Sequence, residues 1–98
     1  MQQFYMVEFD LPSMMAPEFL ARIPEQRNRI DELMAEGQIR SYSLSTNRSK
    51  LWMIVIADSE FEVMQLIGEL PLSDFMIPSI NPLMFHHSME SLMAISLN

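Results

Sequence analysis

A glutamate, an arginine–tyrosine pair and a histidine are the residues of this sequence that could perform acid–base chemistry. Glu8 stands between Val7 and Phe9 in a predicted strand over residues 3–9. A carboxylate in a central strand is partly removed from water, which suits a general base. The alternative is a carboxylate that reaches water or pairs with a Lys or Arg.

Arg40 and Tyr42 fall two residues apart in a predicted second strand over residues 38–45, which places them on one face. An Arg beside a pocket could hold a substrate carboxylate through two parallel hydrogen bonds. It could equally be a solvated charge that protects an edge strand from aggregation. The pair is therefore a candidate ligand-holding group.

Two adjacent histidines, His86 and His87, end the predicted fourth strand. Neighbouring strand residues point to opposite faces, so these two do not bind one metal together, and the sequence offers no third ligand at a suitable spacing. We expect no metal and no cofactor. His86 remains a candidate acid or base, with a surface or interface histidine as the alternative. Tyr5 and Trp52 could line a ligand pocket or fill the core.

The elements that must position these residues follow the order β-α-β-β-α-β. Strands are predicted over residues 3–9, 38–45, 51–57 and 75–85, a first helix over 17–36, and a second helix from 58–62 to the proline at 71. This order is that of the ferredoxin-like α+β fold, in which the first and third strands are central. Pro78 and Pro82 agree with it, because prolines confine the fourth strand to an edge or a bulge.

Local signals mark the helix ends. Pro17 suits a first helical position, and Gly37 predicts the end of the first helix. Pro24 predicts a kink or a fresh start within that helix. Ser59 and Glu62 have the spacing of a capping box at the start of the second helix.

The strand over residues 51–57 is apolar on both faces, since Leu51, Met53 and Val55 alternate with Trp52, Ile54 and Ile56. Such a strand must be covered on both sides. Two helices can cover only one face of the sheet, so the other face needs a second sheet, which another copy of the chain can supply. We predict a homodimer or larger homo-oligomer. The apolar tail over residues 88–98 is expected to pack on the domain or on a neighbouring subunit.

Composition limits the classes of function. The 98 residues predict one domain, 1–98, and the net charge of −7 with only six Lys and Arg argues against nucleic acid and anionic membrane surfaces as partners. No apolar run is long enough to span a membrane, and the N-terminus lacks the basic region of a signal peptide. With no cysteine, these features predict a cytoplasmic protein. Eleven methionines indicate an adaptable core or, alternatively, a promiscuous binding surface.

Four short runs carry a resemblance to a known family. They are Glu36-Gly37-Gln38-Ile39-Arg40, Ala57-Asp58-Ser59, Leu70-Pro71-Leu72-Ser73-Asp74-Phe75-Met76 and Phe85-His86-His87-Ser88. Through these runs, residues 3–88 resemble the muconolactone isomerase family. The resemblance implies a ferredoxin-like domain whose sheets pair into a dimeric α+β barrel. It also implies a pocket between sheet and helices, completed by a neighbour's C-terminal segment, and a cofactor-free isomerase that moves a proton and a double bond in an unsaturated lactone.

On this hypothesis Glu8 shuttles the proton, Arg40 holds a carboxylate, and Tyr42 or His86 stabilises the enolate. Family enzymes carry polar or basic side chains at the places of Phe4 and Met6, which here are apolar. That difference favours the alternative of a non-catalytic oligomeric barrel that binds a small apolar or lactone-like molecule. Another enzyme class on the same barrel, such as a cofactor-free oxygenase, also stays open, because a fold does not fix a function.

Overall fold

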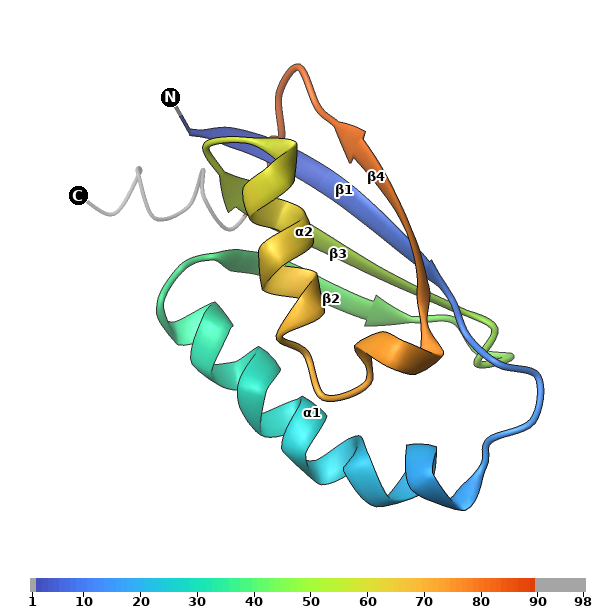
Figure 1. Cartoon of the computed structure of the whole chain (residues 1–98). Helices are drawn as coiled ribbons and strands as arrows, with labels where there is room; N and C mark the ends of the chain where they lie inside the picture. Colours follow the sequence, from blue (N-terminus) through green and yellow to red (C-terminus); the bar gives the residue numbers. More distant parts are fainter. Residues whose placement is uncertain (1, 90–98) are drawn as a thin grey trace.

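The protein, seen here as a computed structural model that describes residues 2–89, is an α+β fold with one four-stranded sheet (Figure 1). Its elements in chain order are β1 (Gln3–Asp10), α1 (Pro17–Ala35), β2 (Ile39–Leu44), β3 (Lys50–Ala57), α2 (Glu60–Gly68), a short 3₁₀ turn (Ser73–Phe75) and β4 (Ile77–Pro82). The predicted β-α-β-β-α-β order is confirmed. The apolar tail expected to pack on the domain or a neighbour falls largely on residues 90–98, outside the described residues.

The sheet has the strand order β2-β3-β1-β4, and every neighbouring pair is antiparallel. β1 and β3 are the central strands, and the two prolines of β4 lie on an edge strand, as predicted. Both helices pack on the same face of the sheet (Figure 1). The fold is therefore ferredoxin-like, with two layers and one sheet face that α1 and α2 leave uncovered.

The core lies between the sheet and the two helices. Alternate residues of the central strands, Val7 and Phe9 on β1 and Met53 and Val55 on β3, are fully buried there. Ile30 and Leu33 of α1 and Val63 of α2 close this layer from the helix side. The period-2 pattern of the strands and the period-3.6 pattern of the helices thus meet in a single core.

The opposite sheet face also carries apolar side chains. Phe4, Met6, Trp52 and Ile56 are partly buried, and Ile54 is 2% exposed. We call these five residues the open-face patch. The pairing of Met6 with Ile54 and of Phe4 with Ile56 across β1 and β3 makes the patch continuous.

The predicted helix ends are confirmed with small shifts. α1 ends at a Schellman motif, in which Gly37 N–H donates to Met34 O and Gln38 N–H donates to Leu33 O, both at 3.0 Å. Gly37 has φ of 82°, a left-handed conformation that glycine adopts without strain. At the start of α2 the Ser59 hydroxyl accepts from Glu62 N–H at 3.2 Å, as the capping box predicts.

Three local expectations need correction. α1 runs through Pro24 as one helix, so the fresh start is wrong. β4 is shorter than predicted and ends at Pro82, which leaves His86 and His87 beyond the strand. β2 carries a register shift between Ile39 and Ser41, so the regular alternation that put Arg40 on the face of Tyr42 does not hold there.

Within the part of the chain that the structure describes, no helix has both the length and the apolar character needed to cross a membrane.

Candidate functional site

A cavity of about 310 Å³ lies beneath the N-terminal half of α1. Its walls come from the β1–α1 connection, α1, β2, β3 and the turn after α2. They are mainly apolar, with side chains such as Leu11, Met15, Phe19, Ile23 and Met76. A mainly apolar cavity with a few polar groups is typical of small-molecule sites.

Local packing fixes the helix side of this cavity. The ring of Phe19 meets the ring of Phe75 edge-on at 5.6 Å, and the Arg22 guanidinium lies 5.4 Å above the Phe75 ring centre. These contacts join the first turns of α1 to the 3₁₀ turn before β4. The strand side is fixed by the hairpin turn, where Asn47 Oδ1 accepts from Ser49 N–H at 3.1 Å.

Two uncharged polar side chains, Gln26 and Tyr42, line the cavity. Gln26 is 2% exposed, and its Oε1 accepts from the backbone N–H of Leu72 at 3.0 Å. Its Nε2 has no hydrogen-bond partner among residues 2–89. A buried amide donor is therefore available inside the cavity wall.

Burial raises the pKa of the Tyr42 hydroxyl, and the Arg27 charge and the Gln26 side chain oppose this rise only in part. The Gln26 amide lies near the Tyr42 hydroxyl, but their geometry falls short of a hydrogen bond. At neutral pH the phenol is consequently protonated and can donate a hydrogen bond.

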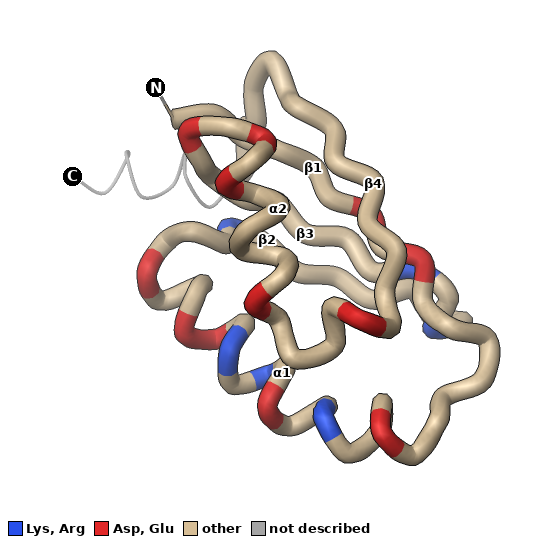
Figure 2. The backbone as a smooth tube through the Cα atoms, in the orientation of Figure 1, with Lys and Arg blue, Asp and Glu red and all other residues tan. Residues whose placement is uncertain are grey.

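Positive charge gathers at this cavity although the chain is acidic. Arg27 on α1 and Arg48 in the hairpin turn are two of the six basic residues and line the cavity, and no Asp or Glu lies among the lining residues that the structure describes. Figure 2 shows basic residues on α1 and at the ends of β2 and β3, and acidic residues on α1 as well. Arg48 has φ of 62°, the left-handed conformation that turns the chain back into β3. The electrostatic balance favours an anionic or oxygen-bearing ligand.

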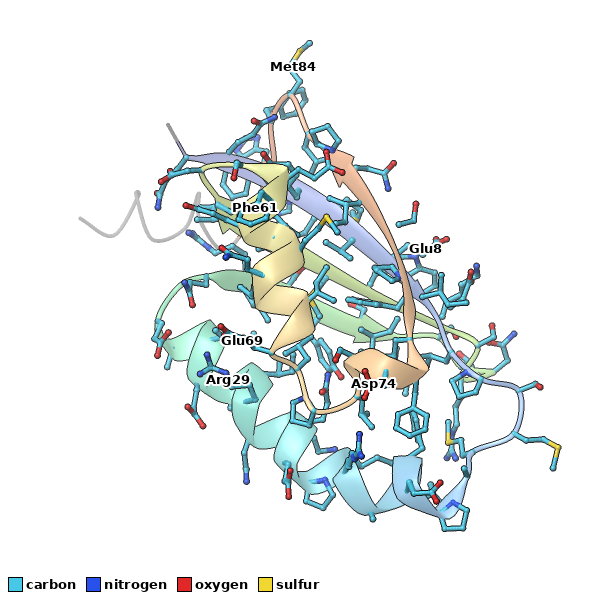
Figure 3. The ribbon with its side chains drawn as sticks, in the orientation of Figure 1. Glu8, Arg29, Phe61, Glu69, Asp74 and Met84 are labelled. Carbon is cyan, nitrogen blue, oxygen red and sulfur yellow. The ribbon has the colours of Figure 1, made fainter. Side chains whose placement is uncertain are left out.

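Glu8 lies elsewhere, on the open sheet face (Figure 3). Its Oε1 accepts from Trp52 Nε1 at 2.8 Å, and its Oε2 lies 3.4 Å from Lys50 Nζ. Lys50 also binds Asp10, and this hydrogen bond is the main reason that the pKa of Lys50 is raised. The structure thus places Glu8 and Trp52 together, in a polar group at one end of the open-face patch.

The other candidate residues do not join that group. Arg40 is exposed at the irregular start of β2, and the His86 ring packs against the Phe4 ring at 5.3 Å. Tyr5 is buried in the core, where its hydroxyl lies 3.4 Å from Gln3 Oε1. Tyr42 is the one sequence-predicted site residue that lines the cavity.

A second hollow, of about 440 Å³, lies between α1 and α2. Arg29 crosses it with ion pairs to Glu32 at 3.2 Å and Glu69 at 3.5 Å (Figure 3). Because these carboxylates already pair with the Arg29 guanidinium, that charge is not available to bind a ligand in this hollow. Among residues 2–89 no group of His, Cys, Asp or Glu side chains is arranged to hold a metal ion.

Gln26, Arg27 and Arg48 were missed by sequence reasoning. The sequence does contain a signal for Gln26. The apolar stripe of α1 includes Ile23 and Ile30, and the residue between them that falls on the same buried side is a glutamine. A polar residue on a buried helix face needs a partner or a function. For Arg48 the sequence holds no comparable sign.

Comparison with known proteins decides the family. The sequence model of the family described as muconolactone delta-isomerase matches residues 3–89. The chain belongs to the muconolactone delta-isomerase family. The resemblance noted over residues 3–88 is thereby confirmed.

One solved protein structure has a similar fold. It is the 5-chloro-2-hydroxyhydroquinone dehydrochlorinase of Burkholderia phenoliruptrix in complex with 2,5-dihydroxybenzoquinone, with a TM-score of 0.53 at 15% identity. The match covers 92% of this chain and 98% of the other. At this identity the likeness concerns the fold alone. No curated protein matches the sequence.

Proposed function

We propose that the protein binds a small unsaturated lactone or related acid in the cavity beneath α1 and acts on it as a cofactor-free isomerase. The observation that carries the proposal is the cavity itself. Apolar walls there surround an unpartnered amide donor, a protonated phenol and two guanidinium groups. Membership of the muconolactone delta-isomerase family supports the same substrate class.

Each polar group has a role that fits such a substrate. Arg27 and Arg48 suit a ligand carboxylate, since a guanidinium binds a carboxylate with two parallel hydrogen bonds. Tyr42 suits the oxygen on which negative charge develops when a carbon next to a carbonyl loses its proton. The apolar walls exclude water and strengthen both interactions.

The proposed isomerisation also needs a proton acceptor. Among residues 2–89, no Asp, Glu or His lines the cavity, and Glu8 stands on the opposite sheet face. One substrate molecule within one chain therefore does not reach both the cavity and Glu8. We keep Glu8 as the proposed proton shuttle, with Arg40 and His86 as its proposed partners, for a substrate that binds the open face.

A second candidate function follows from the same observation. A cavity with hydrogen-bond donors but no base among its lining residues suits a protein that binds its ligand without converting it. The apolar side chains of Phe4 and Met6 on the open face agree with this alternative.

We also propose that two copies associate through the open-face patch. Phe4, Met6, Trp52, Ile54 and Ile56 form a continuous apolar surface that the helices leave uncovered. A second sheet with the same patch would bury it from both sides, as packed sheets do.

Proton NMR of the protein with muconolactone in D₂O tests the proposed activity, because it follows double-bond migration and deuterium uptake together. Enzyme-dependent migration or exchange supports an isomerase. Binding without either change, at high concentration of the folded protein, favours the non-catalytic alternative. Absence of binding removes muconolactone as the ligand.

A further inference from the structure

Gln26 is the least explained side chain of the core. It lies on the buried side of α1, between Ile23 and Ile30, and is 2% exposed. An apolar residue would continue the stripe at no cost, whereas a buried amide is unfavourable unless its hydrogen bonds are made. Position 26 therefore carries a polar side chain where packing of the core favours an apolar one.

The orientation of this amide is fixed by the backbone. Leu72 N–H can only donate, so the Gln26 atom 3.0 Å from it must be the oxygen. The Nε2 group then occupies the other branch of the amide, where no described residue accepts from it. Rotating the amide by half a turn would set two donors against each other, so Nε2 stays directed away from Leu72.

The Tyr42 hydroxyl stands beside this donor. Both side chains line the same cavity. Burial raises the pKa of the Tyr42 hydroxyl, and the Arg27 charge and the Gln26 side chain act against that rise. In the free protein, water that enters the cavity can accept from the amide. A ligand oxygen that reaches the same point meets two donors held by different elements, α1 and β2.

We propose that Gln26 Nε2 and the Tyr42 hydroxyl form a donor pair that binds one oxygen atom of the ligand, a ring carbonyl or the oxyanion derived from it. This inference rests on the proposed function and refines it, because it makes Gln26 the residue that selects rings bearing a carbonyl group. Arg27 and Arg48 then remain for a separate anionic group on the same molecule.

The test compares two small probes of nearly equal shape, furan-2(5H)-one, which has the ring carbonyl, and 2,5-dihydrofuran, which lacks it. Titrations use uniformly ¹⁵N-labelled and methyl-labelled protein. The wild type should bind the furanone at least about fivefold more tightly, the scale of one net hydrogen bond. The side-chain amide resonance of Gln26 should move with the furanone and not with the dihydrofuran.

Two substitutions separate this role from packing. Gln26→Met keeps the volume but removes both polar atoms, and Gln26→Glu keeps an acceptor for Leu72 while removing the donor. Each should lower the affinity ratio of the two probes several-fold, while the Tyr42 hydroxyl, the donor that remains, keeps the ratio above one. Gln65→Met, on the exposed surface of α2, is the matched control and should leave the ratio unchanged. A change in cavity shape alone would weaken both probes together and leave their ratio intact.

The failures are distinguishable. If both probes shift the methyl resonances of Leu11 and Met15 but the Gln26 amide does not respond and the ratio survives Gln26→Met, the cavity binds ligands and the donor pair is refuted. If neither probe moves those methyl resonances, the cavity is not the ligand site, and the proposed function falls together with the inference. Should both Gln26 variants fail to fold, the wild-type amide resonance still decides the question.

Discussion

Introducing a carboxylate into the open-face patch should strongly weaken the proposed association between copies of this chain while leaving each copy folded. Met6 lies at the centre of the patch, paired with Ile54 on β3 and Asn81 on β4. It is partly buried in the single chain, so the side chain of Met6→Glu can still reach water there. In a sheet-to-sheet dimer the same carboxylate would be enclosed among apolar side chains.

The size of the effect follows from that enclosure. An unpaired carboxylate removed from water costs at least about 3 kcal/mol, and each copy contributes one, so the Kd of the dimer should rise by at least roughly 100-fold. Glu8, on the same strand face two residues away, adds repulsion. Stability of the isolated chain should change by about 1 kcal/mol or less, because the substituted side chain stays in contact with solvent.

Sedimentation velocity over a dilution series gives the Kd, and Trp52, the only tryptophan of the chain, reports on the patch by its fluorescence. Dissociation should shift the Trp52 emission to the red as the patch becomes wet. The matched control is Met64→Glu on α2, where the methionine is 58% exposed, and it should leave the Kd unchanged. A wild-type chain that stays monomeric and folded at every concentration would refute the reasoning, as would a Met6→Glu dimer as tight as the wild type.

Three further outcomes are expected. For a substrate that binds the open face, where Glu8 is the proposed proton shuttle, Glu8→Gln should retain the hydrogen bond from Trp52 and the stability, yet lower muconolactone turnover at least about tenfold, since a general base contributes roughly 10²–10⁴-fold; a smaller loss would take Glu8 out of the reaction. Because burial raises the pKa of Tyr42 in the folded protein, its stabilising contribution is complete below the unfolded pKa and is lost as pH rises through the folded value. Urea unfolding at neutral and strongly alkaline pH should therefore show a smaller alkaline loss in Tyr42→Phe, and equal losses would contradict this. Gly37→Ala should destabilise the protein by about 1 kcal/mol, because φ is positive at that position. Gly68→Ala should not destabilise it, because φ is not positive there and an added Cβ meets nothing within 4 Å. Thermal melts of both variants test this, and a greater loss in Gly68→Ala would contradict it.

Most of the fold could be predicted from sequence because its signals are local. Pro17 and Gly37 bracket α1, Ser59 and Glu62 start α2, and the prolines of β4 assign it to an edge. Each signal acts through residues within a few positions of itself, by fixing a dihedral angle or by capping a free N–H group. The two apolar faces of residues 51–57 likewise required β3 to be central.

The candidate site could be predicted only in part. Tyr42 was identified from its strand, but its neighbours Gln26, Arg27 and Arg48 come from a helix and a turn that the sequence does not place relative to β2. The register shift at Ile39 and Ser41 moved Arg40 out of the expected alternation. Glu8 was placed correctly on its strand, and the structure alone shows that it binds Trp52 and faces away from the cavity.

The sequence by itself determined the elements of this protein, their order and the family to which it belongs. Only the tertiary structure decided which polar groups share a cavity and which stand on the open face. The reason is physical. Propensity, capping and periodicity depend on neighbours along the chain, whereas the orientation of the Gln26 amide depends on its hydrogen bond from Leu72, 46 residues away. Among residues 2–89, that long-range contact holds the oxygen of the amide and leaves Nε2 without a partner.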